Sequence, residues 1–213
     1  MKKAFSLSTA YFPPIQYFTK IFASDIIYME AHENYNSQSY RNRTVIIGPN
    51  GKQTLSIPVK KISGKRMPIR DVRIDYTENW QKDHLRSIEM AYKSSPFYEF
   101  YIDALLKFFT EKYTFLFEYN LQILNGLISE IGLSSEIIFT KKFNPNPETG
   151  DFRFSIHPKQ SKQKPDTDFE PRPYIQVFES RFRFMPNLSI LDLLFNQGPN
   201  TELMLGESCR NIV

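Results

Sequence analysis

The first 30 residues alternate between apolar runs short enough for strands and one run with helical spacing. Residues 5–12 and 25–30 each predict a strand, and the apolar positions of residues 15–22 recur every three or four residues, as in a helix. Pro14 suits the first turn of that helix, because its missing N–H costs nothing there. A strand, a short helix and a second strand in this order predict an α/β unit with neighbouring strands.

The next part of the chain carries the pattern of β structure. Residues 44–47 and 53–59 flank an Asn-Gly pair, which supplies the positive φ values that a tight hairpin turn requires. Residues 69–76 alternate between apolar and charged positions, which predicts a half-buried strand. These segments predict a mixed sheet built from the N-terminal half.

Three amphipathic helices are predicted to follow and to form a second layer. The first begins after Asn79, a residue type favoured at helix N-termini. The second restarts at Pro96, and the third ends at Gly132, which fits a left-handed cap. A last strand at 136–140 and a capped helix at 187–195 complete the pattern.

Residues 141–173 interrupt this periodicity. Six of the 14 prolines fall in this stretch, among Asn, Gln, Lys and Asp. A loop this long is either a lid with a function or an ordered, passive connection. We therefore predict an α/β fold in a single domain over residues 1–213, with a mixed sheet, a helical layer and this long Pro-rich loop.

The charge is unevenly distributed. Residues 1–73 hold 12 Lys and Arg against 4 Asp and Glu, and the stretch 60–73 has six basic residues and one acid. This basic stretch is either a solvated hairpin connection or an attractor for nucleic acid, an anionic membrane surface or a phosphorylated small molecule. It contains no aromatic residue, which argues against stacking with single-stranded nucleic acid.

Cysteine content and hydropathy indicate the compartment. The single cysteine, Cys209, allows no internal disulfide framework and fits a reducing environment. No run of about 18 apolar residues occurs, and no apolar leader follows the first two lysines. We expect a cytoplasmic protein without a membrane span.

Several common catalytic motifs are absent from the chain. It has no Gly-rich phosphate loop, no H-E-x-x-H, no G-x-S-x-G and no paired-cysteine zinc spacing, so no metal site is predicted. With eight glycines in all, anion binding has to come from side chains. Arg41, Asn42 and Arg43 are the leading candidates, because two planar cations and an amide precede a predicted strand. In an extended chain, Arg41 and Arg43 would share one face.

The three histidines differ in context. His32 follows a predicted strand at the sheet edge where open α/β folds bind ligands, so it is either a general acid or base or a loop histidine. His84 shares a helix face with Trp80 and is either a core histidine or a pocket wall. His157 precedes a proline in the long loop and is expected to be incidental.

Four stretches together resemble the WbqC-like protein family of bacteria. The resemblance spans nearly the whole chain, and the last stretch is similar to the form seen among Bacteroidetes members. Many members carry Gln-Pro or His-Pro where this chain has Ser8-Thr9, so chemistry that relies on that Gln or His is not expected here. The stretches are residues 11–18, residues 39–43 with 55–59, residues 80–98, and residues 187–199.

The resemblance implies a role in O-antigen and other surface-polysaccharide biosynthesis, with amino-acyl (glycine) or acyl transfer to a sugar as the reaction. The expected partner is an anionic small molecule or a nucleotide-linked sugar, and no cofactor or oligomeric state follows from the sequence. The alternative is a non-catalytic anion-binding or scaffold protein of the same pathway. The expected catalytic residues are His32 and His84, and the expected substrate-binding residues are Arg41, Asn42, Arg43, Trp80 and Tyr11.

Overall fold

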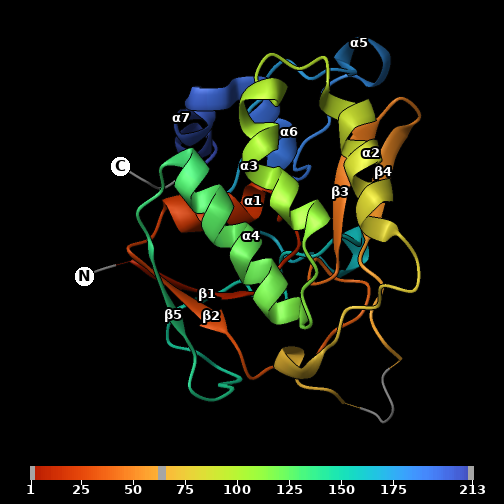
Figure 1. Cartoon of the computed structure of the whole chain (residues 1–213). Helices are drawn as coiled ribbons and strands as arrows, with labels where there is room; N and C mark the ends of the chain where they lie inside the picture. Colours follow the sequence, from red (N-terminus) through yellow and green to blue (C-terminus); the bar gives the residue numbers. More distant parts are fainter. Residues whose placement is uncertain (1–2, 62–65, 211–213) are drawn as a thin grey trace.

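A four-stranded, all-parallel sheet forms one layer of the fold (Figure 1). The computed structural model describes residues 3–61 and 66–210. The predicted strand–helix–strand unit is confirmed, since β1 and β2 are parallel neighbours joined by α1 (Ile15–Phe22). Because every strand runs the same way, all four carboxyl ends lie at one edge. The sheet order is β5-β2-β1-β6, with β1 (Ala4–Ser8), β2 (Ile26–Glu30), β5 (Glu136–Phe139) and β6 (Gly150–Asp151).

The predicted hairpin is also confirmed, and it forms a second, separate sheet. β3 (Arg43–Gly48) pairs with β4 (Gly51–Ser56), and Gly51 has a positive φ of 103°, whereas Asn50 does not take the positive φ predicted for the Asn-Gly pair. The α/β class is therefore confirmed. Its parallel and antiparallel strands are divided between two sheets, and two strands of the parallel sheet come from the second half of the chain.

The strand predicted at 69–76 was wrong. Ile69–Asp71 forms a 3-10 turn (η1), and the residues after it join their neighbours only through isolated bridges, such as Val59 with Ile74. The alternation in the sequence reflects burial, since Val72 and Ile74 are buried and the charged residues between them are exposed. A longer ladder does not form, because Pro58 on the neighbouring segment has no N–H to donate.

The helical layer consists of three long helices, as predicted, and Gly132 ends the third in the left-handed conformation. α6 (Ile190–Gln197) begins after Ser189, whose hydroxyl accepts from the Leu191 N–H. Two further helices, α5 (Glu179–Phe182) and α7 (Thr201–Glu207), were not predicted. The long helices are α2 (Trp80–Tyr92), α3 (Tyr98–Thr110) and α4 (Leu116–Ile131).

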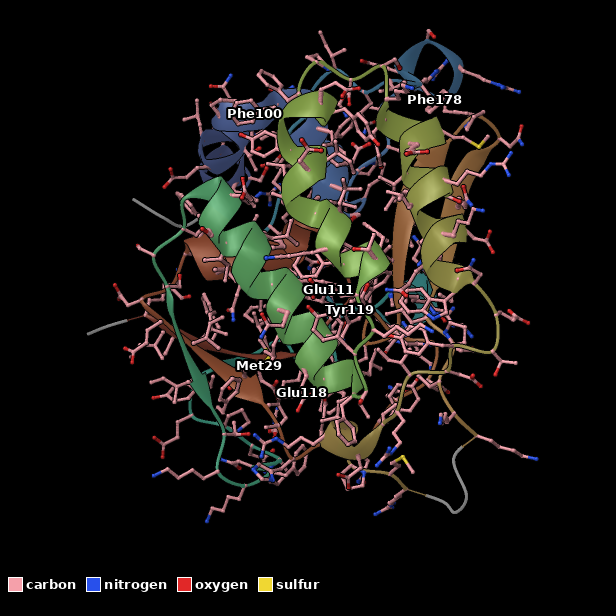
Figure 2. All side chains as sticks on the ribbon, viewed as in Figure 1. Met29, Phe100, Glu111, Glu118, Tyr119 and Phe178 are labelled. Carbon is pink, nitrogen blue, oxygen red and sulfur yellow. The ribbon has the colours of Figure 1, made fainter. Side chains whose placement is uncertain are left out.

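Aromatic side chains, among them Tyr119 of α4 (Figure 2), make up much of the buried core. Tyr11, Tyr92 and Tyr119 are fully buried, and the Tyr119 hydroxyl donates to the Phe108 carbonyl at 2.8 Å. Such bonds matter because a buried hydroxyl without a partner is costly. Across the described part of the chain, no helix combines the length and the apolar composition that a bilayer crossing needs.

Candidate functional site

Three predicted site residues meet in one buried aromatic cluster. Tyr11 follows β1, while Trp80 and His84 lie one turn apart on α2. The Tyr11 hydroxyl and His84 Nδ1 are 2.9 Å apart, and the Trp80 and His84 rings are 5.1 Å apart. Tyr119 of α4 completes the cluster, with ring centroids 5.9 Å from those of both Tyr11 and Trp80. We call these four residues the aromatic cluster.

Asn42 and Arg43 connect to this cluster through the hairpin. The Asn42 side chain donates to the Ile57 carbonyl at 3.1 Å, and the Ile57 N–H donates to the Asn42 carbonyl at 2.7 Å. Arg43 is paired with Ser56 across the hairpin, and the Ser56 backbone lies near enough to His84 to counter part of the lowering of the His84 pKa. Five of the seven predicted site residues therefore lie where the hairpin, α2 and the end of β1 meet.

Four buried polar atoms at this junction have no hydrogen-bond partner among the described residues. They are Asn42 Oδ1, Arg43 Nε, Trp80 Nε1 and Asn120 Oδ1. Asn120 belongs to the junction because its Nδ2 donates to the Arg41 carbonyl at 2.7 Å. Buried polar groups are usually paired, so each of these donors and acceptors has hydrogen-bonding capacity left for a ligand that enters the junction. We call these four residues the polar quartet.

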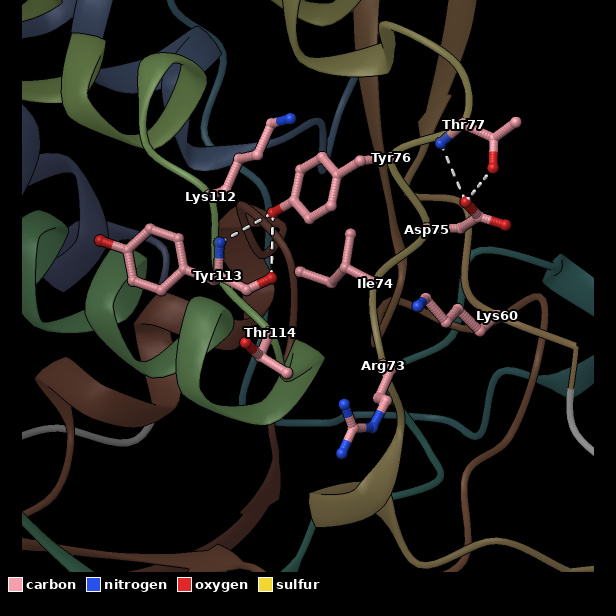
Figure 3. A pocket seen from close by; sticks show the side chains of 9 residues that line it. All are labelled: Lys60, Arg73, Ile74, Asp75, Tyr76, Thr77, Lys112, Tyr113 and Thr114. Atoms are coloured by element: carbon pink, nitrogen blue, oxygen red, sulfur yellow. Dashed lines mark hydrogen bonds between the residues drawn. The ribbon is translucent and has the colours of Figure 1, made fainter.

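A pocket of about 550 Å³ opens beside the aromatic cluster (Figure 3). Lys60, Arg73 and Lys112 reach its lining from three different segments. Tyr76 and Tyr113 line it as well. Their rings lie 5.7 Å from Trp80 and 5.1 Å from Tyr119, respectively. The two tyrosines therefore connect this cationic pocket to the aromatic cluster.

The walls of the cationic pocket are fixed by hydrogen bonds. The Tyr76 hydroxyl donates to the Tyr113 carbonyl at 3.1 Å and accepts from the Tyr113 N–H at 2.9 Å (Figure 3). The Lys60 N–H donates to the Arg73 carbonyl at 2.9 Å. Chain segments far apart in sequence are thus held side by side before any ligand arrives, which reduces the entropy cost of binding.

The electrostatic balance of the cationic pocket is positive. Its one carboxylate, Asp75, accepts hydrogen bonds from the Thr77 hydroxyl and N–H, which lower the Asp75 pKa below its usual value, and nearby Lys60 lowers it further. Asp75 therefore stays ionised at neutral pH. Three cations against one anion attract a negatively charged ligand. Of the basic stretch predicted at 60–73, residues 62–65 lie outside the described residues.

The Arg41 side chain lies away from the cationic pocket, in a buried ion-pair network at the carboxyl edge of the parallel sheet. Its Nε donates to Glu33 Oε1 at 2.7 Å, and its Nη2 donates to Glu33 Oε2 and Ser8 Oγ. Arg153 of the Pro-rich loop pairs with Glu30 at 2.7 Å in the same region. Protein groups already occupy the Arg41 donors.

Residues 37–42 form a turn, so the extended conformation considered for Arg41 and Arg43 does not occur. The two arginines consequently do not share a strand face. His32 is exposed just after β2, and its N–H donates to Glu30 Oε1 at 2.8 Å. His32 therefore lies beside the ion-pair network.

Several of these residues gave little or no signal in the sequence. Lys112 and Tyr113 carried no motif, and they reach the cationic pocket only because their segment pairs with residues 73–76. Glu30, the ion-pair partner of Arg153, could have been found from the sequence, because it ends a predicted strand at the sheet edge where ligands bind. In the described residues, no three His, Cys, Asp or Glu side chains gather so as to hold a metal ion.

Burial of His84 predicts a specific pH dependence of stability. Burial lowers the His84 pKa from 6.5 to about 4. Between these pH values His84 is therefore protonated in the unfolded chain but neutral in the native state. This contribution is complete above pH 6.5 and is lost as the pH falls towards 4. Relative to His84→Gln, the wild type should lose about 3 kcal/mol of unfolding free energy over that interval, measured by urea denaturation.

The comparison of the two proteins isolates this histidine. Asp192 has a pKa raised to about 6 by burial and contributes with the opposite sign, but it does so in both proteins. Parallel pH profiles for wild type and His84→Gln would show that His84 titrates normally in the native state.

The sequence of the chain matches the model of a known protein family. A model of the WbqC-like protein family matches residues 9–164, and the chain belongs to this family. The match covers α1, β2, the hairpin, the three long helices and the ion-paired residues Glu30, Glu33, Arg41 and Arg153.

A mycobacterial relative is similar over almost its whole length. The uncharacterized protein Rv1507c of Mycobacterium tuberculosis (strain ATCC 25618 / H37Rv) is 27% identical over 224 residues, which cover 93% of this chain and 95% of that protein. No solved structure matches the chain significantly.

Proposed function

We propose that this protein is a cytoplasmic transferase of bacterial surface-polysaccharide biosynthesis. Its substrate would be a nucleotide-linked or otherwise phosphorylated sugar, and its reaction amino-acyl (glycine) or acyl transfer to that sugar. The observation that carries the proposal is the position of the cationic pocket next to the aromatic cluster and the polar quartet. Family membership is consistent with it.

The cationic pocket suits the charged part of such a substrate. Lys60, Arg73 and Lys112 would hold phosphate oxygens, the task that glycine-rich loops perform in other folds. Tyr76 and Tyr113 offer ring faces and a hydroxyl to a base or a sugar. A volume of about 550 Å³ falls within the usual range for small-molecule sites.

The polar quartet and His84 suit the transfer step. A sugar amine or hydroxyl attacks the acyl carbon, the acyl bond to the leaving group breaks, and the nucleophile loses a proton. The unpaired Trp80 Nε1–H would donate to the oxyanion that develops on the acyl oxygen, and the Arg43 Nε–H would hold an anionic group of the sugar substrate. His84 is neutral at pH 7, and it would take up the proton transiently through the Tyr11 hydroxyl, which lies 2.9 Å from its Nδ1.

A calorimetric titration tests the binding half of this proposal. With a panel of uridine, guanosine and cytidine diphosphate sugars, we expect at least one to bind and its affinity to fall as salt rises. Lys60→Ala and Arg73→Ala should each weaken binding about tenfold, because each removes a charge-assisted contact. Lys93→Ala is the matched control, since it removes an exposed cation that does not line the pocket.

A non-catalytic anion-binding protein is the second candidate. It is favoured by the cationic pocket itself, whose one carboxylate has a lowered pKa and is a weak base. Binding without transfer from activated acyl or glycyl donors would support this candidate. Absence of binding by every diphosphate sugar, or equal affinity in the Lys60→Ala and Arg73→Ala variants, would contradict both candidates.

A further inference from the structure

A second pocket, of about 370 Å³, is lined by residues on both sides of Asn42 and Arg43 in the sequence. Tyr40 lines this pocket, and its carbonyl accepts from the Tyr11 N–H at 2.8 Å, so the wall is tied to the aromatic cluster. The rest of the lining comes from the hairpin, the Pro-rich loop and residues 186–188. We call it the Tyr40 pocket.

We propose that the Tyr40 pocket binds a neutral sugar unit of a glycan. The inference deepens the proposed function and rests on it only for the glycan's role as the acceptor or as part of the substrate. The binding itself is argued from the lining and is measured independently.

The polar groups of the Tyr40 pocket are mostly uncharged amides. Gln160, Gln163 and Asn187 contribute three side-chain amides, whereas Lys52 is the one cation, and the lining has no carboxylate. An amide both donates and accepts hydrogen bonds, as a sugar hydroxyl does. One lysine is too little charge for a phosphate group, which favours an uncharged ligand. The Tyr40 pocket therefore differs in chemistry from the cationic pocket.

Apolar surface accompanies these amides. Val45 and Leu188 line the pocket together with two prolines and the ring of Tyr40. Small-molecule sites combine such surfaces with a few placed polar groups. A sugar ring matches this division, because its C–H groups form an apolar face and its hydroxyls form a polar edge.

Asn187 is held in one orientation. The Gln16 N–H donates to Asn187 Oδ1 at 2.9 Å, and Asn187 Nδ2 donates to Gln16 Oε1 at 3.1 Å. One N–H and one acceptor position of this amide are left for a ligand. Asn187 also has a φ of 55°, a left-handed conformation that asparagine and glycine adopt more readily than other residues.

The Pro-rich loop is fixed where it reaches the pocket. Gln163 Nε2 donates to the His157 carbonyl at 2.9 Å, which leaves the Gln163 Oε1 acceptor and one N–H for a ligand. His157 is buried and its Nδ1 accepts from the Lys159 N–H at 3.0 Å. This part of the long loop is therefore a preformed wall.

Methyl NMR of the full chain tests the inference, because Val45 and Leu188 carry methyl groups in the lining. The probes are the methyl glycosides of glucose, galactose, mannose and N-acetylglucosamine. We expect at least one to give saturable shifts of both residues, with an affinity that does not change with salt. Asn187→Gly should weaken that affinity about tenfold, because it removes the amide and tolerates the positive φ.

Arg183→Gly is the matched control for Asn187→Gly. Arg183 has a φ of 58° and does not line the Tyr40 pocket, so this variant should bind as the wild type does. Lys60→Ala combined with Arg73→Ala should abolish diphosphate-sugar binding and leave glycoside binding intact, which separates this inference from the proposed function. The absence of saturable shifts with all four glycosides, or unchanged affinity in Asn187→Gly, would overturn it.

Discussion

Arg41→Ala should lower the free energy of unfolding by about 3–5 kcal/mol, because it leaves the buried Glu33 carboxylate without its partner. Both side chains are almost fully buried, and Arg41 also donates to Ser8 at 2.7 Å. The loss would therefore affect the end of β1 as well as the turn that carries Arg41. Urea denaturation at pH 7 measures it.

Two further variants test whether the loss of stability comes from the unpaired charge of Glu33 or from lost packing. Replacing Glu33 and Arg41 together by methionine should recover most of the stability, since a buried pair and an apolar pair of similar volume are often equivalent. Arg210→Ala breaks the exposed pair with Glu170 and should leave the unfolding midpoint unchanged. A stable Arg41→Ala protein that loses diphosphate-sugar binding would instead make Arg41 a ligand residue.

Arg43→Ala, unlike Arg41→Ala, should weaken ligand binding more than it lowers stability. We expect binding of the preferred diphosphate sugar to weaken by about 2–5 kcal/mol, with a smaller change in the free energy of unfolding. Arg43 is half-buried, and its Nε has no partner among the described residues. Its replacement should therefore reduce the binding free energy of the ligand more than the free energy of unfolding. Calorimetry gives the affinity, and urea denaturation gives the stability.

Arg43→Lys tests whether the guanidinium itself matters. Lysine keeps the positive charge but lacks the planar array of donors, so the affinity should stay well below that of the wild type. Wild-type affinity in Arg43→Ala would remove Arg43 from the site. A large loss of stability in Arg43→Ala would mean that this arginine supports the hairpin.

The elements with strong local signals could be predicted from the sequence. Gly51 at the hairpin turn and Gly132 at the end of α4 both have positive φ values, which few residues other than glycine adopt. The pairing of β6 could not be predicted, because a strand of two residues leaves no periodicity and pairs with β1 across most of the chain. α7 was missed because Gly198-Pro199 marks a break, and the chain there forms a 3-10 turn that leads into a new helix.

Some residues of the site could likewise be predicted from the sequence, and others could not. Trp80 and His84 could be placed on one helix face, because four residues separate them. The different environments of Arg41 and Arg43 could not be predicted, since they depend on a turn in which Gln38 has a φ of 59°. The contribution of Lys112 to the cationic pocket requires tertiary pairing that no local pattern encodes.

Tryptophan fluorescence tests the central claim most directly. Trp80 is the one tryptophan of the chain, and its ring lies 5.7 Å from that of Tyr76 in the lining of the cationic pocket. We predict that a diphosphate sugar changes the Trp80 emission saturably in the wild type, and that Lys60→Ala combined with Arg73→Ala abolishes the change. Emission that stays constant with every diphosphate sugar, or an equal change in the double variant, would contradict a substrate site at this junction.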